Sequence, residues 1–342
     1  MQQEGKPKFL KFHQNKVRGV AFSPRDRYLF CSGAYDGKVN LYSALRMELL
    51  MCYQITTMTL ARNVNAVRFT SDGSRILAAT TARRLAVVDV ERGEQLLAYD
   101  NCAFSGQDRT GLAADPVCPN MAVSVAVNGK GLTLLDLRMP LPLDFVYDLH
   151  GSIIRDVCFL GAGWPWTRGG NQASSSSLLS SSAEGAVKVS TLDGRILHSY
   201  HAGHSLNTVC PTPEPYSAGG GEEGRFSSVI MSGGDMISAY MPETETHEVL
   251  KENKDMPVWK LRYTSHGSLL YSACEGAVLR RYRRYPDHHE YLGEVLRHKG
   301  DIQDFDISPY DEFLITASKD RSVGVLRLGA PNHGWTEYSE LT

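Results

Sequence analysis

One stretch of this sequence sets its architecture: His13-Gln-Asn-Lys-Val-Arg-Gly-Val-Ala-Phe-Ser-Pro-Arg-Asp-Arg-Tyr-Leu-Phe-Cys-Ser-Gly-Ala-Tyr-Asp-Gly-Lys-Val-Asn-Leu-Tyr42. Degraded copies of it follow along the chain, and the clearest runs from His298 to Leu326. In each copy an alternating apolar run leads to a turn, a second run follows, and a tight turn such as Asp36-Gly37 opens a third. The chain is therefore expected to repeat one small antiparallel β unit.

The copies recur at the spacing of propeller blades. Their first-strand anchors run from Val17 to Val64, to about Gly111 and onward to Ile302, close to the period of roughly 40 to 45 residues that blades show. Seven such units close a ring, and a ring removes exposed sheet edges. We predict an all-β fold, a seven-bladed β-propeller of four-stranded antiparallel blades that forms one domain, because each blade buries its faces against its neighbours.

The landmarks also predict the extent of each part. The short alternating strand at 8–12 precedes the first blade, whereas the last blade lacks an obvious fourth strand, so we expect the N-terminal strand to complete it and latch the ring. Two Gly-, Ser- and Pro-rich insertions at 160–177 and 211–226 predict mobility. A tail is expected at 329–342. The predicted blades cover about 13–55, 61–100, 102–148, 149–200, 201–250, 251–296 and 297–328.

The pattern resembles the WD-repeat family, whose units begin near Gly-His and end near Trp-Asp. Gly203-His204 keeps the opening dipeptide, Val88-Asp89 and Leu135-Asp136 keep the closing Asp alone, and no unit keeps Trp-Asp. The positions at which the family usually has Trp are occupied here by Tyr42, Tyr240, Tyr282 and Leu326. The resemblance covers about residues 9–328 and implies a fold rather than a chemistry.

The resemblance also implies a role for the repeated polar residues. In the family a turn Asp, a His, a Ser or Thr and the Trp form hydrogen bonds within each blade. Asp36 and Asp320 match the turn Asp, and His13 and His298 match the His. We interpret these four residues as scaffold, because buried polar groups persist when they are paired.

Composition narrows the class of protein. The chain has 42% hydrophobic and 22% charged residues, which is ordinary globular usage, and its net charge of −2 gives no general attraction to nucleic acid or anionic membrane. It holds no apolar run long enough to span a bilayer and begins without a signal peptide. Seven Cys without a Cys-x-x-Cys pair argue against a disulfide framework or a zinc site. We expect a cytosolic or nuclear protein without cofactor.

Two local clusters of charged residues could bind a metal ion or phosphate, but a structural role is favoured for each. Asp287-His288-His289-Glu290 resembles a set of metal ligands, yet neighbours on a strand point to opposite faces, so a solvated turn is favoured. The basic run Arg280-Arg-Tyr-Arg-Arg-Tyr285 could bind phosphate or nucleic acid, but alternation again favours a structural or partner-binding strand. No nucleotide-binding loop, zinc-protease helix or serine-hydrolase elbow is present in the sequence.

Three surfaces are candidates for binding a partner. Trp164 and Trp166 lie in the first insertion and are either interface anchors or packed on their own blade. Asp136 and Arg138 are similar to the Trp-Asp-x-Arg ending by which some WD-repeat proteins dock on the adaptor of cullin-RING ubiquitin ligases, although Leu135 replaces the Trp. The third surface surrounds the central opening, where the starts of the first strands place Lys16, Arg18, Asn65, Arg155, Asn207, Trp259 and Gln303.

Three functions remain open at this point. The first is a non-enzymatic scaffold that binds partner peptides or domains through the propeller faces and inserted loops, as a monomeric propeller within a larger complex. The second is a substrate receptor of a ubiquitin ligase, motivated by Asp136 and Arg138. The third is a propeller hydrolase, the least favoured because the sequence offers no constellation of nucleophile, base and orienting group.

Overall fold

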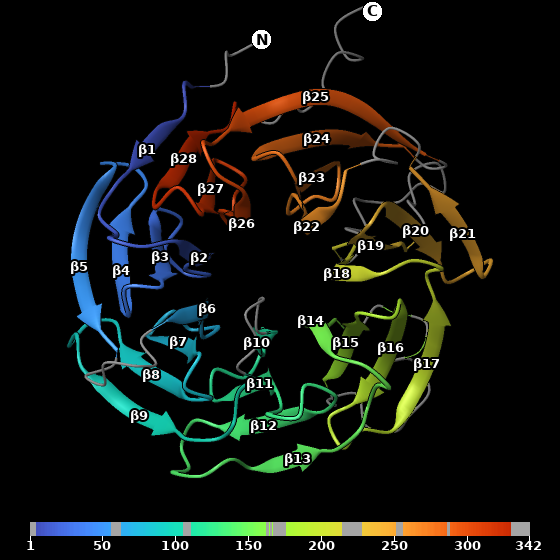
Figure 1. Cartoon of the computed structure of the whole chain (residues 1–342), viewed down its shortest axis with the longest axis horizontal. Coiled ribbons are helices and arrows are strands. Elements are labelled where there is room, and N and C mark those ends of the chain that lie inside the picture. The colour runs from blue at the N-terminus through green and yellow to red at the C-terminus, as the bar shows by residue number, and fades with distance from the viewer. Residues whose placement is uncertain are drawn as a thin grey trace, which may run out of the picture.

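The fold is a ring of seven four-stranded antiparallel sheets (Figure 1). The computed structural model describes residues 5–55, 63–104, 111–161, 164, 166, 176–213, 228–250, 256–285 and 288–329. Within these residues every regular element is a strand, and no helix is long and apolar enough to cross a membrane. The predicted all-β seven-bladed propeller is confirmed.

Strands follow one another from the axis outward in each blade. The first four blades consist of β2 (Val17–Phe22), β3 (Leu29–Ala34), β4 (Lys38–Ser43) and β5 (Glu48–Gln54); β6 (Val64–Phe69), β7 (Arg75–Thr80), β8 (Leu85–Asp89) and β9 (Gln95–Tyr99); β10 (Leu112–Ala114), β11 (Met121–Val125), β12 (Leu132–Asp136) and β13 (Asp144–Val146); β14 (Ile154–Leu160), β15 (Ser177–Ser182), β16 (Ala186–Thr191) and β17 (Ile196–His201).

The last three blades repeat this order and then close the ring. They consist of β18 (Leu206–Pro211), β19 (Ile230–Gly234), β20 (Ile237–Met241) and β21 (Thr246–Val249); β22 (Val258–Tyr263), β23 (Leu269–Cys274), β24 (Val278–Arg284) and β25 (His289–Arg297); β26 (Ile302–Ile307), β27 (Phe313–Ser318), β28 (Val323–Arg327) and the N-terminal β1 (Lys8–Leu10).

The N-terminal strand is the latch that the sequence predicts. Phe9 lies opposite Gly324 in the antiparallel pair of β1 and β28, and Leu10 is buried. The Phe9 ring also meets the His298 ring edge-on, with centroids 4.8 Å apart. First and last segments of the chain are therefore joined by backbone pairing and by side-chain packing.

Among the described residues the core consists of seven apolar clusters, and each of them combines residues of two adjacent blades. Val20 and Phe22 of the first blade pack with Ile315 of the seventh, whereas Ala21 and Cys31 pack with the second blade. Blades approach so closely that a Cβ added at Gly33 would lie 2.5 Å from Val64 Cγ1. Each blade is thus stabilised by its neighbours, as expected of a closed repeat protein.

The polar residues that we interpret as scaffold do pair within their blades. The His13 ring lies between Asp36 (Nδ1 to Oδ2, 2.9 Å) and Ser32 (Nε2 to Oγ, 2.7 Å), and the Ser32 hydroxyl donates to Tyr42 Oη at 3.1 Å. In the seventh blade His298 contacts Asp320 at 3.0 Å and Thr316 at 2.7 Å. Tyr42 thus substitutes for the usual Trp as a hydrogen-bonding partner.

Candidate functional site

The first strand of six blades carries a bulge at the same place. In each, the pairing register shifts by one residue between the first and third positions of the strand, for example between Val17 and Gly19. A bulge leaves its extra residue unpaired and redirects its side chain. The extra residues in order are Arg18, Asn65, Arg155, Asn207, Trp259 and Gln303.

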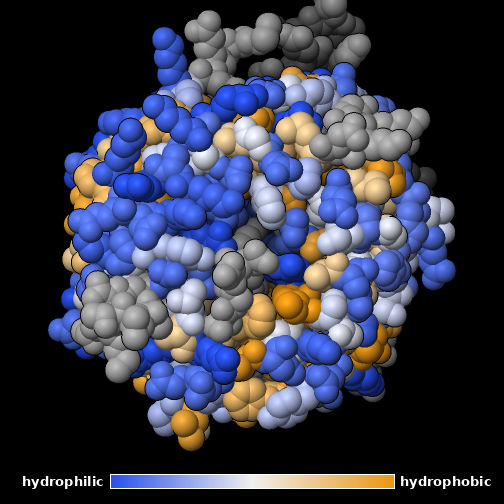
Figure 2. Space-filling model, in the orientation of Figure 1, coloured by the Kyte–Doolittle hydropathy of each residue, from blue (hydrophilic) through white to orange (hydrophobic). Residues whose placement is uncertain are grey.

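These six residues, with Lys16 just before the first strand, are called the bulge ring below. They are the residues that the sequence analysis places around the central opening. Six of them hold the same position in their strands because the bulge occurs at the same place in each blade. Figure 2 shows that hydrophilic residues cover much of the face turned to the viewer. Lys16 is exposed, Arg155, Asn207 and Trp259 are half-buried, and Arg18, Asn65 and Gln303 are buried.

Arg18 departs from our expectation of a partner-binding side chain. It is only 6% exposed, donates a hydrogen bond to Gln303 Oε1 of the seventh blade, and lies over the Tyr35 ring at 5.1 Å. Its charge serves contacts between blades, because a buried guanidinium is stable only when its donors are used. The accessible part of the bulge ring is therefore Lys16, Arg155, Asn207 and Trp259.

Next to the bulge ring along the first strands, buried aspartates join each blade to blades one or two places away. Asp156 of the fourth blade accepts hydrogen bonds from Thr208 Oγ1 (2.7 Å) and Val209 N (3.4 Å) of the fifth, and pairs with Lys260 Nζ of the sixth at 2.8 Å. Each such carboxylate reaches one blade onward through a backbone N–H and a second blade through a cation. We call this arrangement a clasp.

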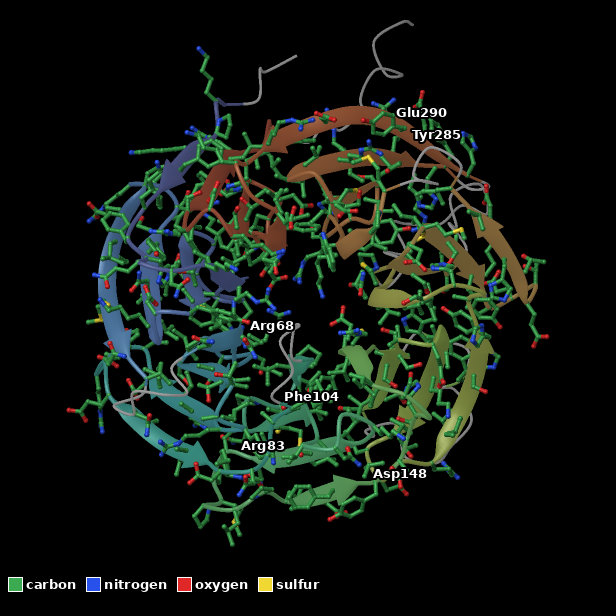
Figure 3. All side chains as sticks on the ribbon, viewed as in Figure 1. Arg68, Arg83, Phe104, Asp148, Tyr285 and Glu290 are labelled. Atoms are coloured by element: carbon green, nitrogen blue, oxygen red, sulfur yellow. The ribbon has the colours of Figure 1, made fainter. Side chains whose placement is uncertain are left out.

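Asp304 repeats the clasp from the seventh blade. It accepts from Val20 N of the first blade (3.4 Å) and pairs with Arg68 of the second (3.3 Å). Figure 3 shows Arg68 at the inner edge of the ring. Burial works against the charge of Arg68, but the carboxylates of Asp304, Asp306 and Asp156 outweigh it and hold its pKa above the ordinary value.

A third carboxylate, Asp306, connects the sixth, seventh and first blades. It accepts from Phe22 N at 2.8 Å and pairs with Arg262 Nε at 2.8 Å. The sequence analysis missed all three aspartates. Their signal is an Asp in a strand that otherwise reads as apolar, at the same distance from the bulge in the fourth and seventh blades (Asp156 and Asp304).

The two tryptophans of the first insertion have different environments. Trp164 is 3% exposed and packs in a core cluster with Leu160 and Leu179, so it is a core residue and not an interface anchor. Trp166 is half-buried and stacks on Trp164 (6.1 Å between centroids) and on His198 (4.4 Å). The alternative that they pack on their own blade holds for Trp164. Most of the two insertions and of the C-terminal tail lies outside the described residues.

Asp136 and Arg138 form a two-pronged pair at the end of β12. Arg138 Nε lies 2.9 Å from Asp136 Oδ1, and Nη2 lies 2.7 Å from Oδ2. The hydrogen bonds from Arg138 lower the pKa of Asp136. The Arg138 side chain is 68% exposed, whereas Leu135 is fully buried where the family has Trp. Arg138 is thus both accessible and oriented.

The residues of the possible metal cluster diverge. His289 Nε2 is 2.8 Å from Tyr263 Oη, His288 stacks on Tyr285, and the Tyr285 hydroxyl donates to Glu290 at 3.1 Å. Figure 3 shows Tyr285 and Glu290 at the outer edge of the ring, and Asp287 lies outside the described residues. In the part of the chain that the structure describes, no three potential ligands gather at one point.

The basic run on β24 is largely built into the sixth blade. Tyr282 is fully buried and Arg284 is 8% exposed, with its guanidinium 5.7 Å from the Tyr263 ring centroid. Arg280 lies over Tyr291 at 5.5 Å. The alternate residues Tyr282 and Arg284 therefore face the interior, as the period of a strand requires.

Comparisons with known proteins agree with this architecture. The family model described as "WD domain, G-beta repeat" matches residues 6–43 and 290–325, the first and last parts of the ring. A chain in the structure titled "Crystal Structure of Mitotic Checkpoint Complex" is similar with a TM-score of 0.73 over 96% of this chain and 92% of that chain, at 13% identity. At this identity the likeness concerns the fold alone. No curated protein matches the sequence.

Proposed function

Because the chain is a WD-repeat β-propeller, we propose that it is a non-enzymatic interaction scaffold that binds a segment of a partner protein at the bulge ring. Proteins of this fold commonly present their faces to other proteins, and the similar chain belongs to a multiprotein complex by its title. One observation carries the proposal: bulges expose Arg155 and Trp259 near the starts of β14 and β22, and the exposed Lys16 directly precedes the corresponding strand β2.

The side chains at this mouth favour a segment with acidic and apolar residues. Arg155 and Lys16 supply positive charge. The half-buried Trp259 supplies an aromatic surface, and Trp side chains often contribute much of the binding energy at protein interfaces. Lys319 lies 6.0 Å from the Trp259 ring and is held by Asp301 at 2.8 Å, so the Trp ring has a fixed neighbour. Beneath it, the clasps keep the first strands in place.

Affinity purification of the whole chain with mass spectrometry tests this role. We expect a set of partners that is lost from the Trp259→Ala and Arg155→Ala variants and retained by Arg46→Ala, whose side chain lies on the outside of the first blade. A purified partner fragment should then bind at least tenfold more weakly to each ring variant. If the partners are retained by both ring variants, the bulge ring is not the binding surface.

A second candidate function is that of a substrate receptor of a cullin-RING ubiquitin ligase. It is supported by Arg138, which is exposed and held in one orientation by Asp136. The expected result is that the adaptor of cullin-RING ubiquitin ligases co-purifies with the wild-type chain but not with Arg138→Ala. Absence of adaptor from the wild-type sample would end this candidate. Both candidates are proposed for a cytosolic or nuclear protein, which imaging of a fluorescent fusion tests.

A further inference from the structure

A cavity of about 350 Å³ lies at the other end of the first strands from the bulge ring. Its wall comes from the ends of β14, β18, β22 and β26, so it is shared by the fourth to seventh blades. The volume is at the lower end of the range for small-ligand pockets and fits one or two amino acid residues. We propose that this cavity binds a carboxylate that is presented beside an apolar group, as at an acidic residue or the C-terminus of a peptide.

The described lining of the cavity holds two cations and one carboxylate. Lys260 and Arg262 line the cavity, and the only carboxylate among its described lining residues is Asp311. Both oxygens of Asp311 already accept hydrogen bonds from Ser265, at 2.7 to 3.0 Å. The aspartates that pair with the two cations, Asp156 and Asp306, are not part of the lining.

Arg262 is the group that would hold the carboxylate. Its Nε is bound by Asp306 Oδ1 at 2.8 Å, and Asp306 is itself fixed by Phe22 N. The Arg262 side chain is 45% exposed, and Asp306 is its only ion-pair partner within the described residues. A guanidinium held through Nε presents its two terminal amino groups, the geometry with which arginine grips a carboxylate through two hydrogen bonds.

The rest of the wall selects for an apolar neighbour. Phe159, Trp164, Leu261 and Ile307 line the cavity, together with prolines that have no N–H to offer. Ser308 of the wall accepts a hydrogen bond from Phe313 N through Oγ at 3.0 Å, and its O–H could add one neutral donor beside the charged Arg262. Arg262 is thus the main source of polar recognition, and an apolar group would cover the remaining surface.

Ligand-observed NMR with 3-phenylpropionate tests the site directly in the intact chain. We expect millimolar binding, about tenfold weaker binding to Arg262→Gln, and no detectable binding of the neutral 3-phenylpropanamide. Arg262→Lys keeps the charge but loses the two-pronged geometry and should be intermediate. Arg297→Gln, which changes an exposed arginine paired with Glu294 in the same blade, is the matched control and should bind as wild type.

Two peptides distinguish the source of the carboxylate. Ac-Pro-Leu-Glu-Leu-Pro-NH2 offers a side-chain carboxylate, and Ac-Pro-Leu-Phe-OH offers a chain terminus. Binding of either one that depends on Arg262 supports the proposal and names the source. The proposal is wrong if acid and amide bind equally, if Arg262→Gln binds like wild type, if inorganic phosphate displaces 3-phenylpropionate at equal concentration, or if none of the three acids binds. Because Trp259 lies at the opposite mouth, Trp259→Ala should not change any of these results.

Discussion

Asp156 and Lys260 belong to the fourth and sixth blades, which are not adjacent, yet their side chains meet at 2.8 Å. The fifth blade lies between them and contributes Thr208 and Val209 N to the same carboxylate. A closed ring makes such a contact possible, because first strands two blades apart both face the axis. The pair therefore links three blades at once, and its loss should be felt by the whole ring.

Replacing Lys260 with Met is expected to lower the free energy of unfolding by about 3 to 5 kcal/mol, because it removes the ammonium group that lies 2.8 Å from the buried charge of Asp156. The two side chains are only 9% and 7% exposed. Urea denaturation followed by circular dichroism measures the loss. The Lys260→Met and Asp156→Asn double variant should be more stable than Lys260→Met alone. Arg46→Met, in an exposed pair with Glu48, should cost less than about 1 kcal/mol. Equal losses at the two sites would contradict the clasp.

Trp164 and Trp166 should differ in their contributions to stability. Removal of the buried Trp164 side chain in Trp164→Ala is expected to cost about 3 to 5 kcal/mol, as for other large core residues. Trp166→Ala removes a half-buried ring that stacks on His198 and should cost clearly less. Urea denaturation of both variants measures the difference. A larger loss for Trp166 would show that the first insertion packs differently.

Gly324→Ala should loosen the N-terminal latch. The new Cβ would lie 2.4 Å from Thr316 Oγ1 and 2.9 Å from His298 Nε2, and so would displace the 2.7 Å contact between these two side chains. Overpacking of this kind costs about 1 to 3 kcal/mol. Hydrogen exchange should speed up in β1 and β28, which pair at Phe9 and Gly324. Gly5→Ala, whose Cβ would meet Arg327 at an ordinary 3.5 Å, is the control that should change little.

Stability should fall in mild acid because of buried histidines. Burial, with a smaller effect of Lys188, lowers the pKa of His150 to about 4, and burial does the same for His289. A folded-state pKa below the unfolded value of 6.5 means that the unfolded chain takes up protons first. The stabilisation is therefore complete above pH 6.5 and is lost as the pH falls from 6.5 to 4.

The test is the free energy of unfolding at several pH values between 7 and 4. His150→Gln should reduce the slope in this window without abolishing it, because His289 still titrates. A His150→Gln variant with the wild-type slope would show that His150 accepts a proton while the ring is folded.

The sequence alone determined the ring, its latch and the scaffold role of the repeated residues. Alternation and turn residues are local signals, and their recurrence carries the register from one blade to the next. That is why the pairing of β1 with β28, and the contacts of His13 and His298, follow from residue order. The sequence also predicted that the members of the bulge ring lie at the starts of the first strands.

Only the tertiary structure decided which of those residues face a partner and which hold the ring together. Arg18 and Arg155 occupy the same place in the repeat, but one reaches Gln303 in the adjoining blade and is buried, whereas the other is half-buried. The partners of Asp156 and Arg262 likewise depend on blades brought together by ring closure. Burial and ion pairing are set by distances between segments far apart in the chain, and a local pattern carries no information on those distances.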